Sequence, residues 1–368
     1  MKIKSIELTN FRNYSNLFFE FKEDKTLVIG KNAQGKTNFL EALYYLSSLN
    51  SKRISRDSEL ISFNEDLAKL KAVIVKDDYE QELEVIINPP KKKILKVNGL
   101  KKNKSSEFLR VLSIVNFCVD DLLLLRGDPS NRRHWLDEAI CQIFPIYSDK
   151  LSKYNKIRLQ KSNYLAQFAV VDDMLDVFNS QLATSGANII YLRKKFLKEI
   201  AKVAVIKHEN IAKGEVLKLM YETSVGDMND DMSPGEIEEV FKQSLNDIRQ
   251  DEIRRAQCLI GPHRDDVSYF INDIDSKKFA SQGQQRTIVL ALKLAELEII
   301  KEKNNDIPIL LLDDVLAELD NVRQNFLLDA VEDKIQTVIT SVDTLAFDKK
   351  FLENVDIINI KNGEIINE

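Results

Sequence analysis

The stretch VIGKNAQGKT, residues 28–37, restricts the possible folds of this chain more than any other part of the sequence. Gly30 to Thr37 match the pattern GxxxxGK[ST], between an apolar stretch with strand character and a periodic helical pattern. Glycines allow the backbone to curl until several N–H groups point inward, and the dipole of the following helix adds positive potential there. The sequence therefore predicts a phosphate-binding loop that joins a strand to a helix.

The residue types in this loop indicate individual roles toward a nucleoside triphosphate. Lys36 is expected to reach the β- and γ-phosphates and to act in catalysis, and the Thr37 hydroxyl is expected to ligate Mg²⁺. The predicted nucleotide-binding residues of the loop are Gly30, Lys31, Asn32, Ala33, Gln34, Gly35, Lys36, Thr37 and Asn38.

A second motif, PILLLDDV at residues 308–315, consists of apolar residues followed by two carboxylates. We expect a short buried strand, with Asp313 holding Mg²⁺ through water and Asp314 polarising the attacking water as a catalytic residue. By itself the pattern also fits a strand that simply ends in acidic residues. The phosphate loop upstream favours the catalytic interpretation.

The third motif, SQGQQR at residues 281–286, begins a strongly periodic helix. Ser281, Gly283 and Gln284 present a hydroxyl, an unhindered backbone N–H and an amide at a helix N-terminus, which can bind an anion. A plain polar helix cap is the alternative. One nucleotide has only one γ-phosphate. A second phosphate-binding helix is therefore explained if it contacts the nucleotide that another copy of the chain binds.

The pattern of apolar residues predicts an α/β fold in three segments. Residues 1–118 alternate as short strands around one helix and include Asn98-Gly99, a strong hairpin signal, in KKKILKVNGLKKNK. Residues 119–301 have mostly helical periodicity, with Ser233-Pro234 as a helix start. Residues 302–368 return to strands, so the helical segment is predicted to be an insertion in a β-rich lobe.

Composition excludes some classes of protein and leaves others open. The chain has 368 residues and a net charge of −5, so any nucleic-acid surface must be local. Its three cysteines form no CxxC pair and it has only three histidines, which favours reduced thiols over a zinc site. The sequence shows no signal-peptide pattern and no apolar run long enough for a membrane span, so we expect a cytoplasmic protein.

Taken together, the motifs resemble those of the RecF family, within the SMC-like group of ATP-binding-cassette (ABC-type) ATPase heads. The resemblance is carried by LTNFRNY (8–14), GKNAQGKTNFLEAL (30–43), LLLLRGDPSNRRHWLD (122–137), GPHRDD (261–266), SQGQQR (281–286) and LLLDDVLAELD (310–320). It implies an ATP- and Mg²⁺-dependent homodimer that binds DNA at gaps or single-strand/double-strand junctions. With RecO and RecR, such a protein promotes loading of RecA, in recombinational repair, replication restart and SOS induction.

The same resemblance assigns roles to individual residues. It implies that Ser281, Gly283 and Gln284 touch the γ-phosphate of the other subunit, and that Ala317–Asp320 is the D-loop at the dimer interface. Thr340-Ser341 stands at the switch position, where transporter cassettes have His, and Asp314 stands where many cassettes have Glu. Both departures fit slow hydrolysis that serves as a switch. The Q-loop assignment stays open, with NFCVDD (116–121) near the expected place.

Local clusters of basic residues suggest where DNA binds. The candidates are Lys52, Arg53, Arg56, Lys91, Lys92, Lys93, Lys101 and Lys102. The lysines at 91–104 are equally consistent with an edge hairpin kept soluble by charge. Arg132-Arg133 and Arg193-Lys194-Lys195 are weaker candidates, for which solvated helix faces are the alternative. Asn10-Phe11-Arg12 fits either a nucleotide contact or a structural turn.

Two other functions remain as alternatives. A transporter-type ABC ATPase subunit would share the nucleotide motifs, but the helical insertion is larger than that class needs. A small-molecule kinase would leave SQGQQR and the D-loop match without a purpose. Both are weaker hypotheses than the DNA-repair ATPase.

Overall fold

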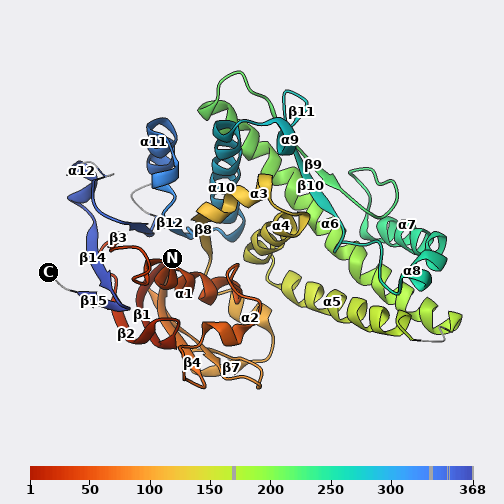
Figure 1. Cartoon of the computed structure of the whole chain (residues 1–368), viewed down its shortest axis with the longest axis horizontal. Coiled ribbons are helices and arrows are strands. Elements are labelled where there is room, and N and C mark those ends of the chain that lie inside the picture. The colour runs from red at the N-terminus through yellow and green to blue at the C-terminus, as the bar shows by residue number, and fades with distance from the viewer. Residues whose placement is uncertain (168–170, 331–334, 346, 348, 367–368) are drawn as a thin grey trace. The chain divides into compact units, whose positions relative to one another are not determined.

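The computed structural model describes residues 1–167, 171–330, 335–345, 347 and 349–366. Its contacts divide the chain into two compact units (Figure 1): Met1–Asp121 with Leu290–Glu368, called the sheet unit here, and Leu122–Val289, called the helical unit. The sequence placed these boundaries at 118/119 and 301/302. The second boundary lies at 289/290 in the structure, inside the helix from Gln282 to Asn304, which contributes residues to both units. Helical periodicity does not reveal at which residue the packing partners change.

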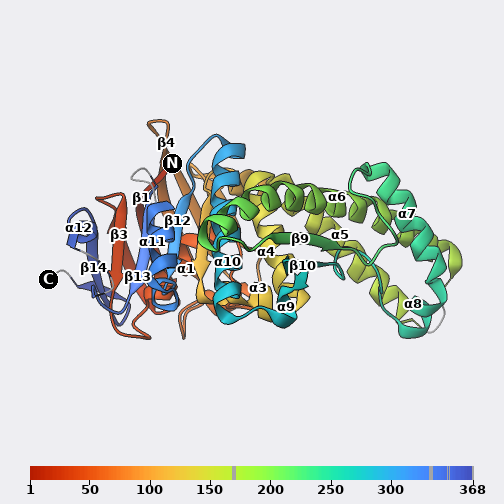
Figure 2. The same cartoon turned by 90° about the horizontal axis from the view of Figure 1, so that it is seen from above.

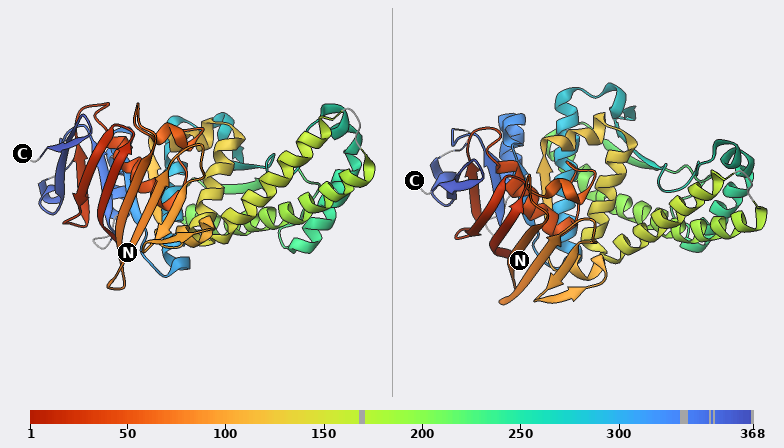
Figure 3. Two further views of the ribbon diagram at one scale, coloured as in Figure 1. Left: turned by 90° about the horizontal axis from the view of Figure 1, so that it is seen from below. Right: turned by 60° about the horizontal axis from the view of Figure 1, so that its bottom comes forward.

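An antiparallel sheet of six strands, in the order β2-β1-β4-β5-β6-β7, forms one layer of the sheet unit (Figure 3). Apolar and polar residues alternate along β1 and β4, so one face is buried and the other carries charges. The predicted hairpin is confirmed, with Asn98 and Gly99 at φ of 51° and 74° between β6 and β7. The strands are β1 Lys2–Phe11, β2 Tyr14–Glu20, β4 Ala68–Lys76, β5 Tyr79–Ile87, β6 Ile94–Val97 and β7 Leu100–Lys102.

A second sheet in the same unit is parallel except for its last strand pair. Its order is β15-β14-β3-β13-β12-β8. The strand before the phosphate loop, the carboxylate strand and the further strands expected within 302–368 are present, but β8, beside the carboxylate strand, was not predicted. The strands are β3 Lys25–Ile29, β8 Ile114–Cys118, β12 Ile309–Asp313, β13 Thr337–Ser341, β14 Asp356–Lys361 and β15 Glu364–Ile366.

Helix α1, Lys36–Ser48, links the two sheets by contacting β1, β4 and β5 of the first and β8, β12 and β13 of the second. Its apolar residues Phe39, Leu40 and Leu43 are at most 2 % exposed. Burial of each such side chain contributes about 1.5–3 kcal/mol. The position of α1 is therefore fixed from both sides. The shorter helices of the unit are η1 Asp57–Leu60, α2 Ser105–Leu109, η3 Leu316–Glu318, α11 Asn321–Ala330 and α12 Lys349–Leu352.

The helical unit is built on two long helices, α5 and α6, which lie side by side (Figures 2 and 3). Helix α7 and strand β9 also pack on α6, and β9, β10 and β11 form a small antiparallel sheet. The helices are η2 Val119–Leu122 at the boundary, α3 Leu123–Arg126, α4 Pro129–Ile143, α5 Ile146–Leu165, α6 Asp172–Ile211, α7 Pro234–Asp247, α8 Arg249–Arg255, α9 Ser276–Phe279 and the start of α10 Gln282–Asn304. The strands are β9 Leu217–Glu222, β10 Asp266–Ile271 and β11 Ile274–Asp275.

Two features of this unit differ from the prediction and one agrees. The short strand β9 was missed. The helical periodicity that follows Ser233 is interrupted at Ile248, where α7 ends and α8 begins. The predicted helix start is confirmed, because the Ser233 hydroxyl accepts a hydrogen bond from the Glu236 N–H and the Glu236 carboxylate accepts one from the Ser233 N–H.

Arginines that looked like weak DNA candidates are buried structural groups. Arg193 is 2 % exposed and donates two hydrogen bonds to Asp137, each 2.8 Å long. Arg132 is 3 % exposed and pairs with Asp266 at 2.6 Å and 3.0 Å. The solvated-face interpretation was therefore wrong for both residues. Truncating one member of such a pair leaves a buried charge and costs about 3–5 kcal/mol.

His263 of the GPHRDD segment is packed inside the same unit. The Tyr154 hydroxyl lies 2.7 Å from its Nδ1, and the Cys258 carbonyl lies 3.3 Å from its Nε2. Burial lowers the pKa of His263 to about 3. The folded chain therefore keeps this imidazole neutral at a pH where the unfolded chain protonates it, near 6.5.

We expect the helical unit to lose stability as the pH falls from about 6.5 toward 3, since only the unfolded chain binds the extra proton. At pH 5 the loss from His263 alone is about 2 kcal/mol relative to pH 8. Urea unfolding followed by the fluorescence of Trp135, the only tryptophan, measures it. His263→Gln should flatten this pH dependence, and an unchanged slope in the variant would refute the assignment.

Candidate nucleotide-binding site

The loop predicted to bind phosphate lies between β3 and α1 in the sheet unit. Gly30 and Gly35 adopt φ of 152° and 121°, a region that side chains rarely enter. A Cβ on Gly30 would lie 2.5 Å from the Ile360 carbonyl oxygen. Ala33, between them, has φ of 65°. The two glycines are thus required by the curl of the backbone and by the close approach of β14.

Two neighbouring turns hold this loop in place. The Asn13 side-chain amide, between β1 and β2, donates to the Gln34 carbonyl at 3.0 Å. From the turn between β14 and β15, the Gly363 N–H donates to the same carbonyl at 3.0 Å. The Asn362 N–H donates to the Gln34 side-chain oxygen at 2.8 Å. The first turn lies in the segment LTNFRNY (8–14) that the sequence analysis singled out, whereas the Asn362-Gly363 turn was not singled out, although it carries an ordinary turn signal.

Lys36 is almost completely buried at the start of α1, with 4 % exposure. Its ammonium donates to the carbonyls of Gly30 and Lys31, at 2.8 Å and 3.3 Å. Neutral carbonyls do not balance a buried positive charge, so the site is favourable for an anion. This arrangement fits the phosphates of a nucleotide.

The carboxylates at the end of β12 meet the loop through hydroxyl groups. The Thr37 and Thr340 hydroxyls both donate to Asp313 Oδ1, at 3.2 Å and 2.9 Å. The Asp314 N–H donates to the Thr340 hydroxyl at 2.9 Å. The parallel register of β12 with β13 brings these side chains to one sheet edge. The structure therefore joins the two motifs that are 276 residues apart.

The environment of Asp313 fits a divalent cation. Burial raises its pKa, and the neighbouring Asp314 carboxylate raises it further. No cluster of three or more His, Cys, Asp or Glu side chains suited to a metal occurs among the described residues. Mg²⁺ does not need one, because it is commonly held by one or two protein oxygens, water and substrate phosphates. Thr37 and Asp313 would supply those protein oxygens.

Next to the loop, Arg12 and Glu41 form an ion pair with two hydrogen bonds, at 2.9 Å and 2.7 Å. Arg53 also reaches Glu41, at 3.1 Å, and donates to the Asn38 side chain at 2.8 Å. A hollow of about 740 Å³ is lined by Arg12, Asn38, Arg53 and the 97 % exposed Phe63, among others. Its position beside Asn38 suits the nucleoside part of a nucleotide.

The SQGQQR segment lies in the helical unit and caps α10. The Ser281 N–H donates to Gln284 Oε1 at 2.9 Å, and the Gln284 N–H donates to the Ser281 hydroxyl at 3.3 Å. The Gln284 amide also donates to Glu215, whose other oxygen lies 3.1 Å from His208 Nε2. The polar-cap interpretation is thus confirmed for the chain alone. A role of Ser281, Gly283 and Gln284 toward a second subunit stays a prediction.

The segment Ala317–Asp320, which matches a D-loop, leads into α11 in the sheet unit. The Asp320 carboxylate accepts from the Arg323 N–H at 3.0 Å, and the Gln324 amide donates to the Leu316 and Leu319 carbonyls. The segment is therefore held in a defined turn. In the segment 116–121, for which the Q-loop assignment stays open, the Asp121 carboxylate accepts a hydrogen bond from the Cys118 N–H at 2.9 Å.

The predicted DNA contacts fall into two groups. Lys52, Arg53 and Lys93 are held by carboxylates, Lys52 by the buried Asp121 at 2.7 Å and Lys93 by Asp57 at 3.0 Å. The other candidates lie at or near the surface: Arg56, Lys91, Lys92, Lys101 and the partly buried Lys102. Lys101 and Lys102 lie on β7, the predicted edge strand of the sheet. Their binding to DNA stays a prediction.

Comparisons with known proteins agree with this architecture over almost the whole chain. The family model described as RecF/RecN/SMC N terminal domain matches residues 2–365. The chain is 40 % identical to the DNA replication and repair protein RecF of Bacillus cereus strain B4264, over 99 % of this chain and 98 % of that protein. The chain belongs to the RecF branch of the RecF/RecN/SMC family.

Two solved structures share the fold of this chain to different degrees. The recombination mediator protein RecF-ATPrS in the RecFOR pathway matches with a TM-score of 0.91 and 33 % identity, over 99 % of this chain and 97 % of the other. An SMC head bound to the C-terminal winged-helix domain of ScpA matches with a TM-score of 0.54 and 16 % identity, over 100 % and 97 % of the two chains, which shows the shared fold. The predicted ABC-type head fold with a helical lobe is confirmed. Within the described segments, every helix is too short or too polar to span a bilayer.

Gly363 provides a test of the turn that supports the loop. A Cβ there would lie 2.2 Å from the Asn13 carbonyl oxygen, whereas a Cβ on Gly99 would meet nothing within 4 Å. Both glycines have positive φ, 79° and 74°, so Gly→Ala costs about 1–2 kcal/mol of backbone strain at each.

We expect Gly363→Ala to destabilise the sheet unit more than Gly99→Ala, because only the former displaces backbone next to Gln34. Hydrogen exchange at the amides of residues 30–36 measures the local effect. Equal exchange in the two variants would show that the β14–β15 turn does not support the loop.

Proposed function

We propose that the chain is an ATP-dependent, DNA-binding switch of DNA replication and repair. The observation that carries this proposal is the combination of the buried Lys36 ammonium with the Thr37–Asp313–Thr340 cluster at one sheet edge. Family membership and the ATP-bound relatives support ATP as the nucleotide. The repair role of the relatives favours DNA over the membrane partner of a transporter subunit or the metabolite of a kinase.

In this proposal the loop residues 30–38 bind the phosphates through backbone N–H groups. Lys36 contacts the β- and γ-phosphates, and the Thr37 hydroxyl and Asp313 hold Mg²⁺, directly and through water respectively. A bound Mg²⁺ supplies positive charge next to the γ-phosphate. The Asp313 carboxylate, whose pKa is raised by burial, is stabilised in its ionised form by that charge.

Asp314 is proposed to orient the attacking water in a slow hydrolysis. The residue has φ of 53°, in the left-handed region, and its N–H is fixed by Thr340. An aspartate also reaches less far than the glutamate of many cassette ATPases. Hydrolysis would then time the release of a clamp, so the chain is a weak ATPase and not a metabolic enzyme.

The proposed switch is a homodimer in which ATP bound by one subunit is touched by Ser281, Gly283 and Gln284 of the other. The dimer would bind gapped DNA or single-strand/double-strand junctions, without sequence specificity. It would act with RecR and RecO to promote RecA loading in gap repair, replication restart and SOS induction, in the cytoplasm. The relatives' place in the RecFOR pathway supports these partners.

Lys36→Ala should weaken ATP binding by about 10–100-fold, because it removes a charged hydrogen-bond donor worth about 1.5–3 kcal/mol. Lys22→Ala is the matched control, since Lys22 is an exposed lysine of the same unit that lies outside the loop, and it should bind ATP as wild type does. Isothermal titration with ATP and Mg²⁺ measures both affinities. Equal affinities for wild type and Lys36→Ala would contradict the phosphate role.

Ser281→Arg should leave ATP binding intact but abolish ATP-dependent dimers. The substitution removes the hydroxyl that contacts the γ-phosphate of the other subunit and puts a bulky side chain in its place. Ser233→Arg is a matched control: both serines are exposed and cap a helix through the same reciprocal pattern. Sedimentation with ATP or ADP, with and without gapped DNA, reports the oligomeric state. An ATP dimer that survives in Ser281→Arg, or a wild type that stays monomeric with ATP, would refute the trans contact.

A further inference from the structure

A hollow of about 540 Å³ between α5 and α6 of the helical unit has an unusual lining. One wall carries Lys150, Lys153 and Lys156, which are spaced three residues apart and so share one face of α5. The facing wall carries hydroxyl and amide side chains of α6, including Ser180, Thr184 and Asn188. Within the described part of the chain, the lining contains no carboxylate and no aromatic ring.

The charges of this hollow are largely uncompensated. Lys150 donates to the Asn188 side-chain oxygen at 3.3 Å, which is a neutral acceptor. Lys153 and Lys156 are exposed, and no described residue forms an ion pair with either. One carboxylate that contacts the lining is Glu238, which accepts from Thr184 at 2.8 Å and is itself paired with Lys242 at 2.9 Å. The hollow is therefore a positive site in a chain whose net charge is −5.

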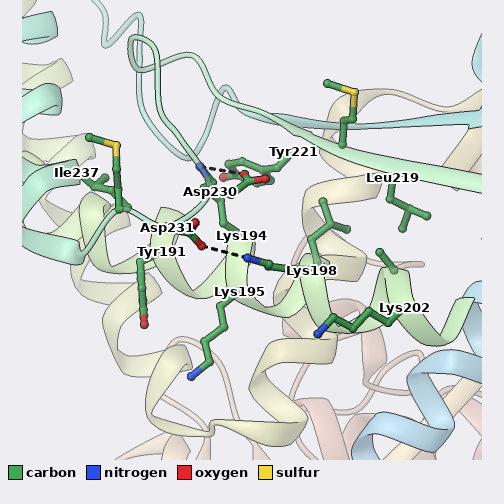
Figure 4. Close-up of a pocket in the computed structure, with 14 residues that line it drawn as sticks. Tyr191, Lys194, Lys195, Lys198, Lys202, Leu219, Tyr221, Asp230, Asp231 and Ile237 are labelled. Carbon is green, nitrogen blue, oxygen red and sulfur yellow. Dashed lines mark hydrogen bonds and ion pairs between the residues drawn. The ribbon is translucent and has the colours of Figure 1, made fainter. Parts of the chain in front are cut away.

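A second lysine-rich hollow in the same unit provides the contrast (Figure 4). It contains Lys194, Lys195, Lys198 and Lys202 of α6, but also Asp230 and Asp231 of the 226–233 loop. Figure 4 shows Lys198 joined to Asp231, a contact of 3.1 Å. Lys194 lies 3.5 Å from Asp230. Part of the lysine charge in this hollow is thus neutralised by the chain itself, unlike that of Lys153 and Lys156.

We propose that the α5–α6 hollow binds the phosphate backbone of double-stranded DNA. Ammonium groups and hydroxyls are the donors that recognise phosphate without reading sequence. Lys150 to Lys156 span about 9 Å along the helix axis, which corresponds to about two or three phosphates of one strand. Because aromatic rings for base stacking are missing from the lining, the hollow suits duplex better than single strands. This site rests on the proposed DNA-binding function and adds a contact face on the helical unit.

The test is a salt titration of duplex binding by the full-length chain with ATP and Mg²⁺. Each lost phosphate contact makes the slope of log affinity against log salt shallower by about 0.9. The variant K153Q/K156Q should therefore lose about 1.8 from the slope, measured by anisotropy of a labelled duplex between about 50 and 200 mM salt. Gln160→Lys, which adds a cation to the same α5 wall, should steepen it by about 0.9.

The control K194Q/K198Q makes the same charge change in the hollow of Figure 4, where Asp230 and Asp231 already pair with these lysines, and should alter the slope less. Unchanged binding in K153Q/K156Q, or an equal loss in the control, would overturn the assignment of this site. Failure of the wild type to bind duplex at all would instead refute the proposed function. Unaltered ATP affinity and helical circular dichroism in each variant confirm that the fold is intact.

Discussion

The backbone curl between Gly30 and Gly35 is the constraint on which the candidate site depends. It exists because both positions lack a Cβ and because the adjoining turns at Asn13 and Asn362-Gly363 hydrogen-bond to Gln34. Helix α1 begins directly after this curl and is packed between two sheets. The start of the helix, and with it Lys36, therefore has little freedom to move. A phosphate site of this kind is pre-organised before any ligand arrives.

Buried charge has two different uses in this chain. In the helical unit, Arg193 and Arg132 are matched by Asp137 and Asp266, so their charges are balanced and stabilise the fold. At the loop, the ammonium of Lys36 is held by neutral carbonyls. Balanced pairs indicate structure, whereas a buried charge without a charged partner indicates a ligand. A related difference in pairing separates the α5–α6 hollow, whose Lys153 and Lys156 are exposed and form no ion pair with a described residue, from the hollow that contains Asp230 and Asp231.

The SQGQQR segment (281–286) has one role within the chain and a second, proposed role toward another subunit. Ser281 and Gln284 cap the start of α10 in the isolated chain, and Glu215 holds the Gln284 amide. A helix that is capped this way has a defined start, so its exposed Ser281 is ready to contact a second molecule. Capping alone does not require such a partner. In the proposed dimer, the nucleotide of the other subunit would add a separate free-energy term, present only when a γ-phosphate is bound.

The sequence alone determined the local elements and the chemistry of the loop, because GxxxxGK[ST], the apolar run before Asp313 and the Asn98-Gly99 turn act over short distances. It did not reveal β8 or β9, whose short apolar patterns are ambiguous, nor the residue of α10 at which one packing unit ends. Only the tertiary structure brought Thr37, Asp313 and Thr340 together, and only it showed that Arg193, Lys52 and Lys93 are already paired. The reason is that hydrogen-bond and ion-pair partners are chosen by proximity in space, whereas a linear pattern records only propensity and spacing.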